Sequence, residues 1–204
     1  MKRPLSLLML VAVCGCVRLS QPAPEIRDYR LDYPPPSVNG TPLPAVLAVP
    51  SLRVAAVYDR EAIVYRQGAN ATGTYFYTRW SANPGNMVAD LLARDFAESN
   101  LYRAVSRGPS SLPADYEVTG FIDEIEERVA PAGCAAHLQL RVLLARTTGS
   151  GNPVRLQRSY GGDEPCTCDR PAALAAAMSR VLERISTQLQ QDVYDAVSKS
   201  NSHS

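Results

Sequence analysis

The chain has 204 residues and a formal net charge of +1, with 21 basic and 20 acidic side chains. A length in this range is typical of one domain, so we expect a single hydrophobic core. The balanced charge gives no overall basic field and excludes a role that depends on binding nucleic acid.

The first fifteen residues have the pattern of an export signal. Lys2 and Arg3 precede an apolar run from Pro4 to Val13, which is about half of the roughly 20 residues that a membrane-spanning helix needs. We therefore predict that residues 1–15 are a signal peptide that is removed. The remaining 189 residues have a formal charge of −1, because both N-terminal basic residues leave with the signal.

Cys16 follows this run behind a glycine, in the string Val13-Cys14-Gly15-Cys16. The string resembles the lipobox of bacterial lipoproteins, so we predict that Cys16 is acylated and anchors the protein firmly through several acyl chains. An ordinary secretory signal with two incidental cysteines is the alternative. In such lipoproteins, Asp after the acylated Cys retains the protein at the inner membrane. Val17 stands there instead and favours the periplasmic face of the outer membrane.

The chain after the signal begins with a tether and continues into the domain. Residues 16–25 contain two prolines and no apolar periodicity, which predicts an extended tether. The domain is predicted over residues 26–197. Its first part contains β-branched and aromatic runs typical of strands. These predicted strands cover residues 26–33, a bent or bulged segment at 45–57, and a hairpin formed by 61–66 and 73–80.

A helix is predicted after Asn83, because a capping Asn followed by Pro84 is typical of a helix start. Apolar residues then recur at helical spacing to Asn100, which indicates an amphipathic helix.

In the predicted strand at residues 115–129, the alternation of apolar and polar residues slips near Asp123 and Glu124. The later predicted strands cover residues 101–106, 115–129, 134–146 and 154–160.

A second helix is predicted from about Arg170, where a long apolar stripe begins. Residues 198–204 are predicted to form a disordered tail. Strands, helix, strands and helix in this order predict an α+β fold. In this fold a mainly antiparallel or mixed sheet carries two amphipathic helices packed on one face.

Three cysteines remain in the domain, in a compartment that permits disulfides. Residues 134–146 and 154–160 can form a hairpin in which the numbers of two residues that face each other add up to about 300. Cys134 then lies opposite Cys166, close enough for a disulfide. Cys168 is then the odd thiol or the alternative partner. Zinc binding is disfavoured, because the cysteine spacing is not that of a standard finger.

Side chains suited to catalysis are few. The two histidines are His137, on the polar face of a predicted strand, and His203, in the tail, and neither has a plausible triad. No nucleophile or phosphate-binding motif occurs. The acidic cluster between Asp123 and Glu127 favours a solvated strand end over a cation site. We therefore expect no enzyme activity, no metal and no cofactor.

Aromatic residues gather in one third of the chain. Strand alternation places Tyr75, Tyr77 and Arg79 on one face, and Phe76 with Trp80 on the other. Core filling is the default interpretation, but a mixed surface of aromatic and arginine side chains is also preferred at protein interfaces. The predicted partner-binding residues are Arg66, Tyr75, Tyr77, Arg79 and Trp80.

Several short motifs occur in a fixed order along the domain. They are Val57-Tyr58-Asp59-Arg60, Ile63-Val64-Tyr65-Arg66 and Tyr75-Phe76-Tyr77-Thr78-Arg79-Trp80, then Pro84 and a helix that ends before Leu101-Tyr102-Arg103-Ala104-Val105. Behind a lipoprotein signal, this order resembles the ABC-type transport auxiliary lipoprotein family, which includes the paraquat-inducible protein C type. The resemblance covers roughly residues 26–195.

The resemblance implies a non-catalytic accessory component of an Mce-type ABC transport system for lipids or other hydrophobic substrates. Its implied partners are a periplasmic Mce-domain protein, docked at the outer membrane, and the ABC permease and ATPase of that system. Two alternatives stay open. One is an outer-membrane assembly lipoprotein that partners a β-barrel, resembling the small partner of the lipopolysaccharide translocon. The other is a direct periplasmic lipid carrier, which needs a sizeable apolar cavity.

Overall fold

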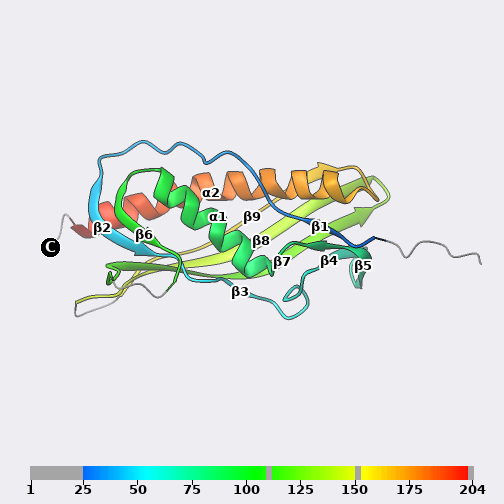
Figure 1. Ribbon diagram of the computed structural model, residues 1–204, viewed down its shortest axis with the longest axis horizontal. Coiled ribbons are helices and arrows are strands. Elements are labelled where there is room, and N and C mark those ends of the chain that lie inside the picture. Colours follow the sequence, from blue (N-terminus) through cyan, green and yellow to red (C-terminus); the bar gives the residue numbers. More distant parts are fainter. Residues whose placement is uncertain (1–24, 109–111, 150–152, 202–204) are drawn as a thin grey trace, which may run out of the picture.

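The structure, a computed structural model, describes residues 25–108, 112–149 and 153–201 (Figure 1). A nine-stranded mixed sheet carries two helices on one face, which confirms the predicted α+β fold. The predicted signal peptide, Cys16 with nearly all of the tether, and the last three residues lie outside the described part of the chain.

The long strand β7 (Tyr116–Ala130) is the centre of the sheet. One of its edges pairs antiparallel with β8, which pairs antiparallel with β9. Its other edge is shared by three short parallel strands that follow one another along it. The bounds are β8 (Gly133–Arg146) and β9 (Val154–Cys166) on the first edge, and β2 (Leu43–Ala48), β3 (Arg53–Val54) and β4 (Ala62–Gln67) on the second.

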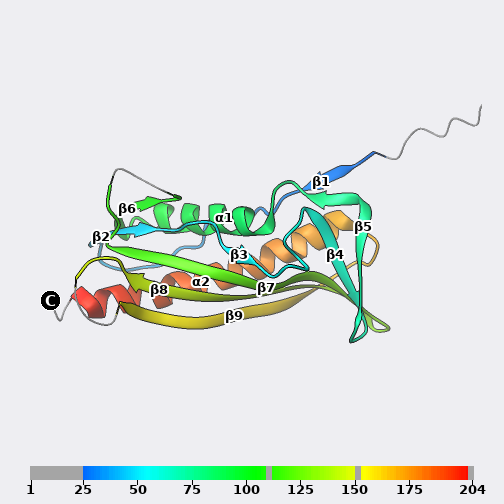
Figure 2. The same cartoon turned by 90° about the horizontal axis from the view of Figure 1, so that it is seen from below.

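Three outer strands complete the sheet. β6 (Tyr102–Ser106) pairs parallel with β2, and β5 (Ala71–Trp80) pairs antiparallel with β4. β1 (Arg27–Tyr29) pairs parallel with the end of β5. The first described segment therefore enters the sheet beside β5, at one end of the molecule (Figure 2).

Strand alternation explains why one face of the sheet is covered and the other is not. On β8, Leu138 and Leu140 are fully buried, whereas Gln139 and Arg141 between and after them are exposed. The buried set packs against the two helices in one continuous core. The alternate set lies on the other face, and Figure 1 shows that both helices are on one side of the sheet.

Helix α1 (Pro84–Glu98) begins as the sequence predicted. The Asn83 side chain accepts a hydrogen bond of 2.9 Å from the Gly85 N–H, and Pro84 occupies the first turn. A Cβ at Gly85 would lie 2.1 Å from the carbonyl oxygen of Leu52. The glycine therefore allows the start of the helix to pack closely on the chain between β2 and β3.

Helix α2 (Pro171–Asn201) lies along the length of the sheet and ends far from the first described residues (Figures 1 and 2). It continues to Asn201, whereas the sequence predicted a disordered tail from Ser198. Val197 is fully buried, so the apolar stripe still has a surface to pack on in the last turns. Within the described ranges, no helix has the length and apolar character that a membrane span requires.

A buried carboxylate joins both helices to the segment after β1. Asp95 of α1 is fully buried and accepts hydrogen bonds from the Tyr33 hydroxyl at 2.7 Å and the Ser186 hydroxyl at 2.5 Å. The Arg94 guanidinium lies 2.7 Å from the same carboxylate. Burial, and then the charge of Asp95, raises the pKa of Tyr33. No sequence pattern predicted this cluster, which depends on segments far apart in the chain.

The slip in the alternation of β7 is confirmed. The register changes between Ile122 opposite Leu140 and Glu124 opposite Gln139, so the side chains of β7 exchange faces at this β-bulge. Glu127 consequently joins the helix-covered side.

The acidic cluster was predicted to form a solvated strand end, and this prediction is wrong for Glu126 and Glu127. Glu126 is 1% exposed and Glu127 is 2% exposed, because β4, β5 and the turn before β4 bring side chains over the two carboxylates. Tyr58 and Arg66 contact Glu126, and Tyr75 contacts Glu127.

Candidate interaction site

Strand β5 carries a wide bulge at the end of the molecule where β1 enters. The register between β4 and β5 shifts so that Ile63 alone stands opposite the four residues Tyr75–Thr78. We call these four residues the aromatic bulge. Within it the Phe76 side chain is 88% exposed and Tyr77 is 54% exposed. A hollow of about 480 Å³ borders the aromatic bulge, and its lining combines four aromatic rings with polar side chains that include Asp169.

The bulge also explains why Trp80 is not part of a surface. The bulge adds an odd number of residues to β5. Even-numbered side chains before the bulge and even-numbered side chains after it therefore point to opposite faces of the sheet. Phe76 is therefore exposed, whereas Trp80 is 1% exposed and belongs to the core. The prediction that Trp80 contacts a partner is wrong for this reason.

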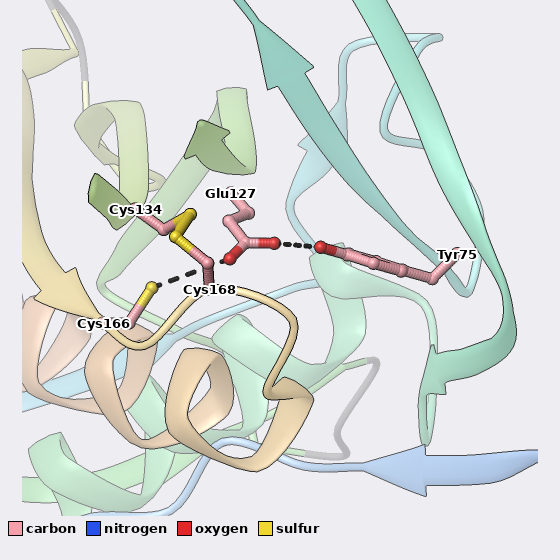
Figure 3. Close-up of a disulfide and its surroundings, with 5 residues drawn as sticks. All are labelled: Tyr75, Glu127, Cys134, Cys166 and Cys168. Carbon is pink, nitrogen blue, oxygen red and sulfur yellow. Dashed lines mark hydrogen bonds between the residues drawn. A yellow bond between two sulfur atoms is a disulfide. The ribbon is translucent and has the colours of Figure 1, made fainter. Parts of the chain in front are cut away.

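Tyr75 supports the aromatic bulge from the inside. Its hydroxyl donates a hydrogen bond to the Glu127 carboxylate (Figure 3), and its ring centroid lies 5.2 Å from that of Tyr65. Gly73 stands opposite Tyr65 in the register, and a Cβ there would lie 2.4 Å from the Tyr65 hydroxyl oxygen. The missing side chain thus makes room for the tyrosine pair. Tyr75 acts as a structural support and does not present its hydroxyl to a partner.

Glu127 lies between Tyr75 and a free cysteine (Figure 3). The Cys166 thiol is 3.9 Å from the other carboxylate oxygen of Glu127. Burial raises the pKa of Glu127. Burial, together with the neighbouring Glu127, raises the pKa of the Cys166 thiol to about 11. Because only the thiolate is strongly nucleophilic, this raised pKa disfavours reaction of the Cys166 thiol at neutral pH.

The disulfide joins Cys134 to Cys168, with a Cα–Cα distance of 5.2 Å. The register places Cys134 opposite Cys166 as predicted, but the preferred pairing of these two cysteines is wrong and the alternative partner is used. The Cys166 side chain points to Glu127, while the turn after β9 brings Cys168 back over Cys134 (Figure 3).

Arg66 lies on the face of the sheet opposite Glu127, where it neutralises the buried carboxylate of Glu126. Its guanidinium is 2.6 Å from Glu126 and 3.0 Å from Glu124. The Tyr58 hydroxyl donates a further hydrogen bond of 2.6 Å to Glu126. A buried charge requires such partners, so Arg66 has a structural role that its sequence motif did not reveal.

The charged network continues across the sheet. Arg128 pairs with Glu124 at 2.8 Å, and His137 lies 2.9 Å from Asp163 through Nδ1. The other ring nitrogen of His137 lies 3.3 Å from Glu124. Among the residues that the structure describes, no group of three or more His, Cys, Asp or Glu side chains is placed to hold a metal ion.

Arg79 is exposed but also paired. Its guanidinium lies 2.6 Å from Asp28 of β1 and 3.8 Å from Glu61, so it fastens β1 to β5. Of the five predicted partner-binding residues, Tyr77 alone is exposed and not engaged in a polar contact within the described chain. Sequence alternation missed Phe76. The unequal lengths of the predicted hairpin strands, 61–66 and 73–80, are the signal that could have revealed the bulge.

The exposure of Phe76 leads to a prediction about stability. Phe76→Ser should change the unfolding free energy by no more than about 0.5 kcal/mol, because an exposed side chain contributes little to folding. Tyr75→Phe should cost about 1–3 kcal/mol, because a buried carboxylate loses a hydrogen-bond donor. Urea unfolding measures both values. Equal losses in the two variants would contradict the assignment of Phe76 to the surface.

Glu127 makes stability depend on pH. Its pKa is raised in the folded protein, so its contribution is fully present below the unfolded pKa and is lost as the pH rises through the folded pKa. Glu127→Gln removes this loss. The unfolding free energy of the variant minus that of the wild type should therefore increase from about pH 4 to pH 7. Denaturant unfolding across this range tests the sign, and a difference that decreased with pH would contradict it.

Comparison with solved structures shows that this fold recurs. The chain is 21% identical to protein XCC0632 from Xanthomonas campestris, covering 86% of this chain and 99% of that one, with a TM-score of 0.78. It is 11% identical to the hypothetical protein CT253 from Chlamydia trachomatis, covering 76% and 98%, with a TM-score of 0.54. At these identities the likeness concerns the fold alone. Among curated proteins, no sequence matches this chain.

A family profile gives the more specific result. The profile of the ABC-type transport auxiliary lipoprotein component matches residues 29–190, which include β2 to β9 and most of α2. This range covers nearly the whole described domain and confirms the resemblance seen in the motifs. The chain therefore belongs to the family of ABC-type transport auxiliary lipoprotein components.

Proposed function

We propose that this protein is a lipid-anchored, non-catalytic accessory component of an Mce-type ABC transport system for lipids or other hydrophobic substrates. Acylated Cys16 holds it at the periplasmic face of the outer membrane, and its domain docks the periplasmic Mce-domain protein there. The family match over residues 29–190 carries this proposal, because it makes almost the whole domain an auxiliary transport component.

The uncovered face of the sheet is the docking surface that we propose for the Mce-domain protein. There Phe121 lies between two arginines, with guanidinium carbons 5.4 Å (Arg53) and 5.0 Å (Arg141) from its ring centroid. A shallow hollow of about 630 Å³ surrounds them. Arginine and aromatic side chains are enriched at protein interfaces.

Charge indicates what kind of surface would fit this hollow. Arg141 is paired with Asp123 at 2.7 Å, whereas Arg53 is exposed and makes no ion pair in the described part of the chain. One positive charge thus remains uncompensated beside an aromatic ring. An apolar segment with a carboxylate on the Mce-domain protein would complement both features.

The core favours this accessory role over direct lipid carriage. Leu138, Val181 and Leu182, which lie between sheet and helices, are fully buried members of one continuous cluster. The two hollows described above lie instead at the aromatic bulge and on the uncovered face. A lipid carrier needs an apolar cavity inside the domain, where this chain has packed side chains.

Affinity purification of the full-length acylated protein from membranes tests the function. We expect the Mce-domain protein and its permease to be recovered with the wild type and lost with the Phe121→Ala and Arg53→Glu double variant. Phe76→Ser, which changes an exposed aromatic residue at the end of the molecule, is the matched control and should retain the partner. Recovery of a β-barrel in place of any Mce component would favour the outer-membrane assembly alternative and overturn the proposal.

A further inference from the structure

Three large apolar side chains are exposed together where the chain enters the sheet. Ile26 is 54% exposed, Phe76 88% and Tyr77 54%. The parallel register pairs Arg27 with Thr78, so Ile26 precedes β1 directly beside Tyr77. The rings of Phe76 and Tyr77 have centroids 6.5 Å apart. Exposed apolar groups that gather in this way mark an interaction site.

Polar contacts lie behind the aromatic bulge. The Tyr75 hydroxyl donates a hydrogen bond to buried Glu127, and the Cys134–Cys168 disulfide lies on the other side of that carboxylate (Figure 3). Phe76 and Tyr77 thus stay exposed to water next to a tyrosine whose hydroxyl is engaged. This arrangement indicates that the surface formed by Phe76 and Tyr77 is covered when the protein functions.

The length of the tether indicates what covers it. Nine residues separate Cys16 from Ile26, so even a fully extended chain keeps Ile26 within about 35 Å of the acylated residue. Strand β9 ends near the aromatic bulge, and its thirteen residues place its start at Val154 about 40 Å away. The aromatic bulge is therefore at the end of the domain that the anchor holds near the membrane.

The charges around the aromatic bulge favour an apolar surface over a charged one. Arg79 is paired with Asp28 and Glu61, and Arg27 lies 4.0 Å from Glu25. The ions that border Ile26 and Tyr77 are thus neutralised by one another, whereas Asp169, which lines the hollow beside the bulge, makes no ion pair in the described part of the chain. Tyrosine and other amphipathic aromatic residues are preferred at the boundary between headgroups and acyl chains.

We propose that Ile26, Phe76 and Tyr77 rest in the interface of the phospholipid bilayer that holds the acylated Cys16. This inference rests on the proposed anchorage. It adds a second contact with the membrane, which fixes the orientation of the domain. The start of β9 and the C-terminal end of α2 then point into the periplasm, and the uncovered face of the sheet stays accessible to a partner.

A tryptophan placed in the bulge tests the contact. The wild type has a single tryptophan, Trp80, which is buried and serves as the background. The full-length acylated protein carrying Phe76→Trp is reconstituted into phosphatidylethanolamine and phosphatidylglycerol vesicles with brominated acyl chains. We expect its added emission to shift to shorter wavelength and to be largely quenched. Val154→Trp, an exposed apolar position at the far end of β9, is the matched control and should not be quenched.

The outcomes separate this inference from the anchorage. Acylation is read from the mass of the purified protein, and membrane attachment from flotation with the vesicles. Flotation without quenching of Phe76→Trp overturns the bilayer contact and leaves the anchorage intact. A blue shift without quenching indicates a protein contact at the bulge and also overturns it. Equal quenching of both variants contradicts the proposed orientation, and an unmodified Cys16 overturns the proposed function itself.

Discussion

Loss of the acylation site should release almost all of the protein from the membrane. The change is Cys16→Ser in a chain whose residues 1–15 are replaced by a secretory signal that is cleaved without acylation. Each methylene of a bound acyl chain contributes about 0.8 kcal/mol, and several chains together bind almost irreversibly. The apolar contacts of the aromatic bulge cannot replace that energy. We expect the variant in the soluble periplasmic fraction.

Fractionation with mass measurement of the purified protein checks this result. Phe76→Ser keeps Cys16 and should stay in the membrane fraction, which separates the anchor from the second contact. Thermal unfolding confirms that the released variant is folded. A folded, unacylated protein that remained in the membrane fraction would contradict the assignment of Cys16 as the anchor.

Removal of the disulfide should be the most destabilising of the substitutions considered. The bond closes a loop with a sequence separation of 34 residues, for which loop-closure entropy predicts a loss of about 4 kcal/mol. Cys134→Ser removes the bond and leaves Cys166 no partner in the register. We therefore expect a large decrease in the midpoint of urea unfolding under oxidising conditions, and no further decrease when a reductant is added.

Cys166→Ser is the matched control, because it removes a thiol and keeps the Cys134–Cys168 bond. Its midpoint should lie close to that of the wild type and fall on reduction. Peptide mass analysis should find Cys134 linked to Cys168, with fragment ions that distinguish Cys168 from Cys166 on the same peptide. A link to Cys166 in the folded protein, or a Cys134→Ser variant as stable as the wild type, would contradict the structure.

Much of the fold could be predicted from local patterns. The alternation in β8, the Asn83 cap of α1 and the slip near Asp123 each arise from neighbouring residues, and all three are present in the structure. Contacts between distant segments could not be predicted in this way. In the sequence, Asp95 has the pattern of an ordinary polar residue of α1. Its buried hydrogen bonds come from Tyr33 and Ser186, which lie far from it in the chain.

The candidate site was harder to predict because alternation fails at a bulge. A period of two assigned Phe76 to the same face as Trp80, and the added residues of β5 reverse that assignment. Arg66 and Tyr75 have the composition of an interface, yet buried Glu126 and Glu127 engage them. Side-chain type alone did not separate groups that bind a partner from groups that neutralise a buried charge.

The central claim is that this domain links a transport partner to the outer membrane through its lipid anchor. Density-gradient separation of membranes, in cells that carry either the wild type or the unacylated Cys16→Ser chain, measures the Mce-domain protein that sediments with the outer membrane. The account predicts that this fraction is lost when acylation is lost, although the unacylated domain is folded and present in the periplasm. An unchanged fraction of Mce-domain protein at the outer membrane would contradict it.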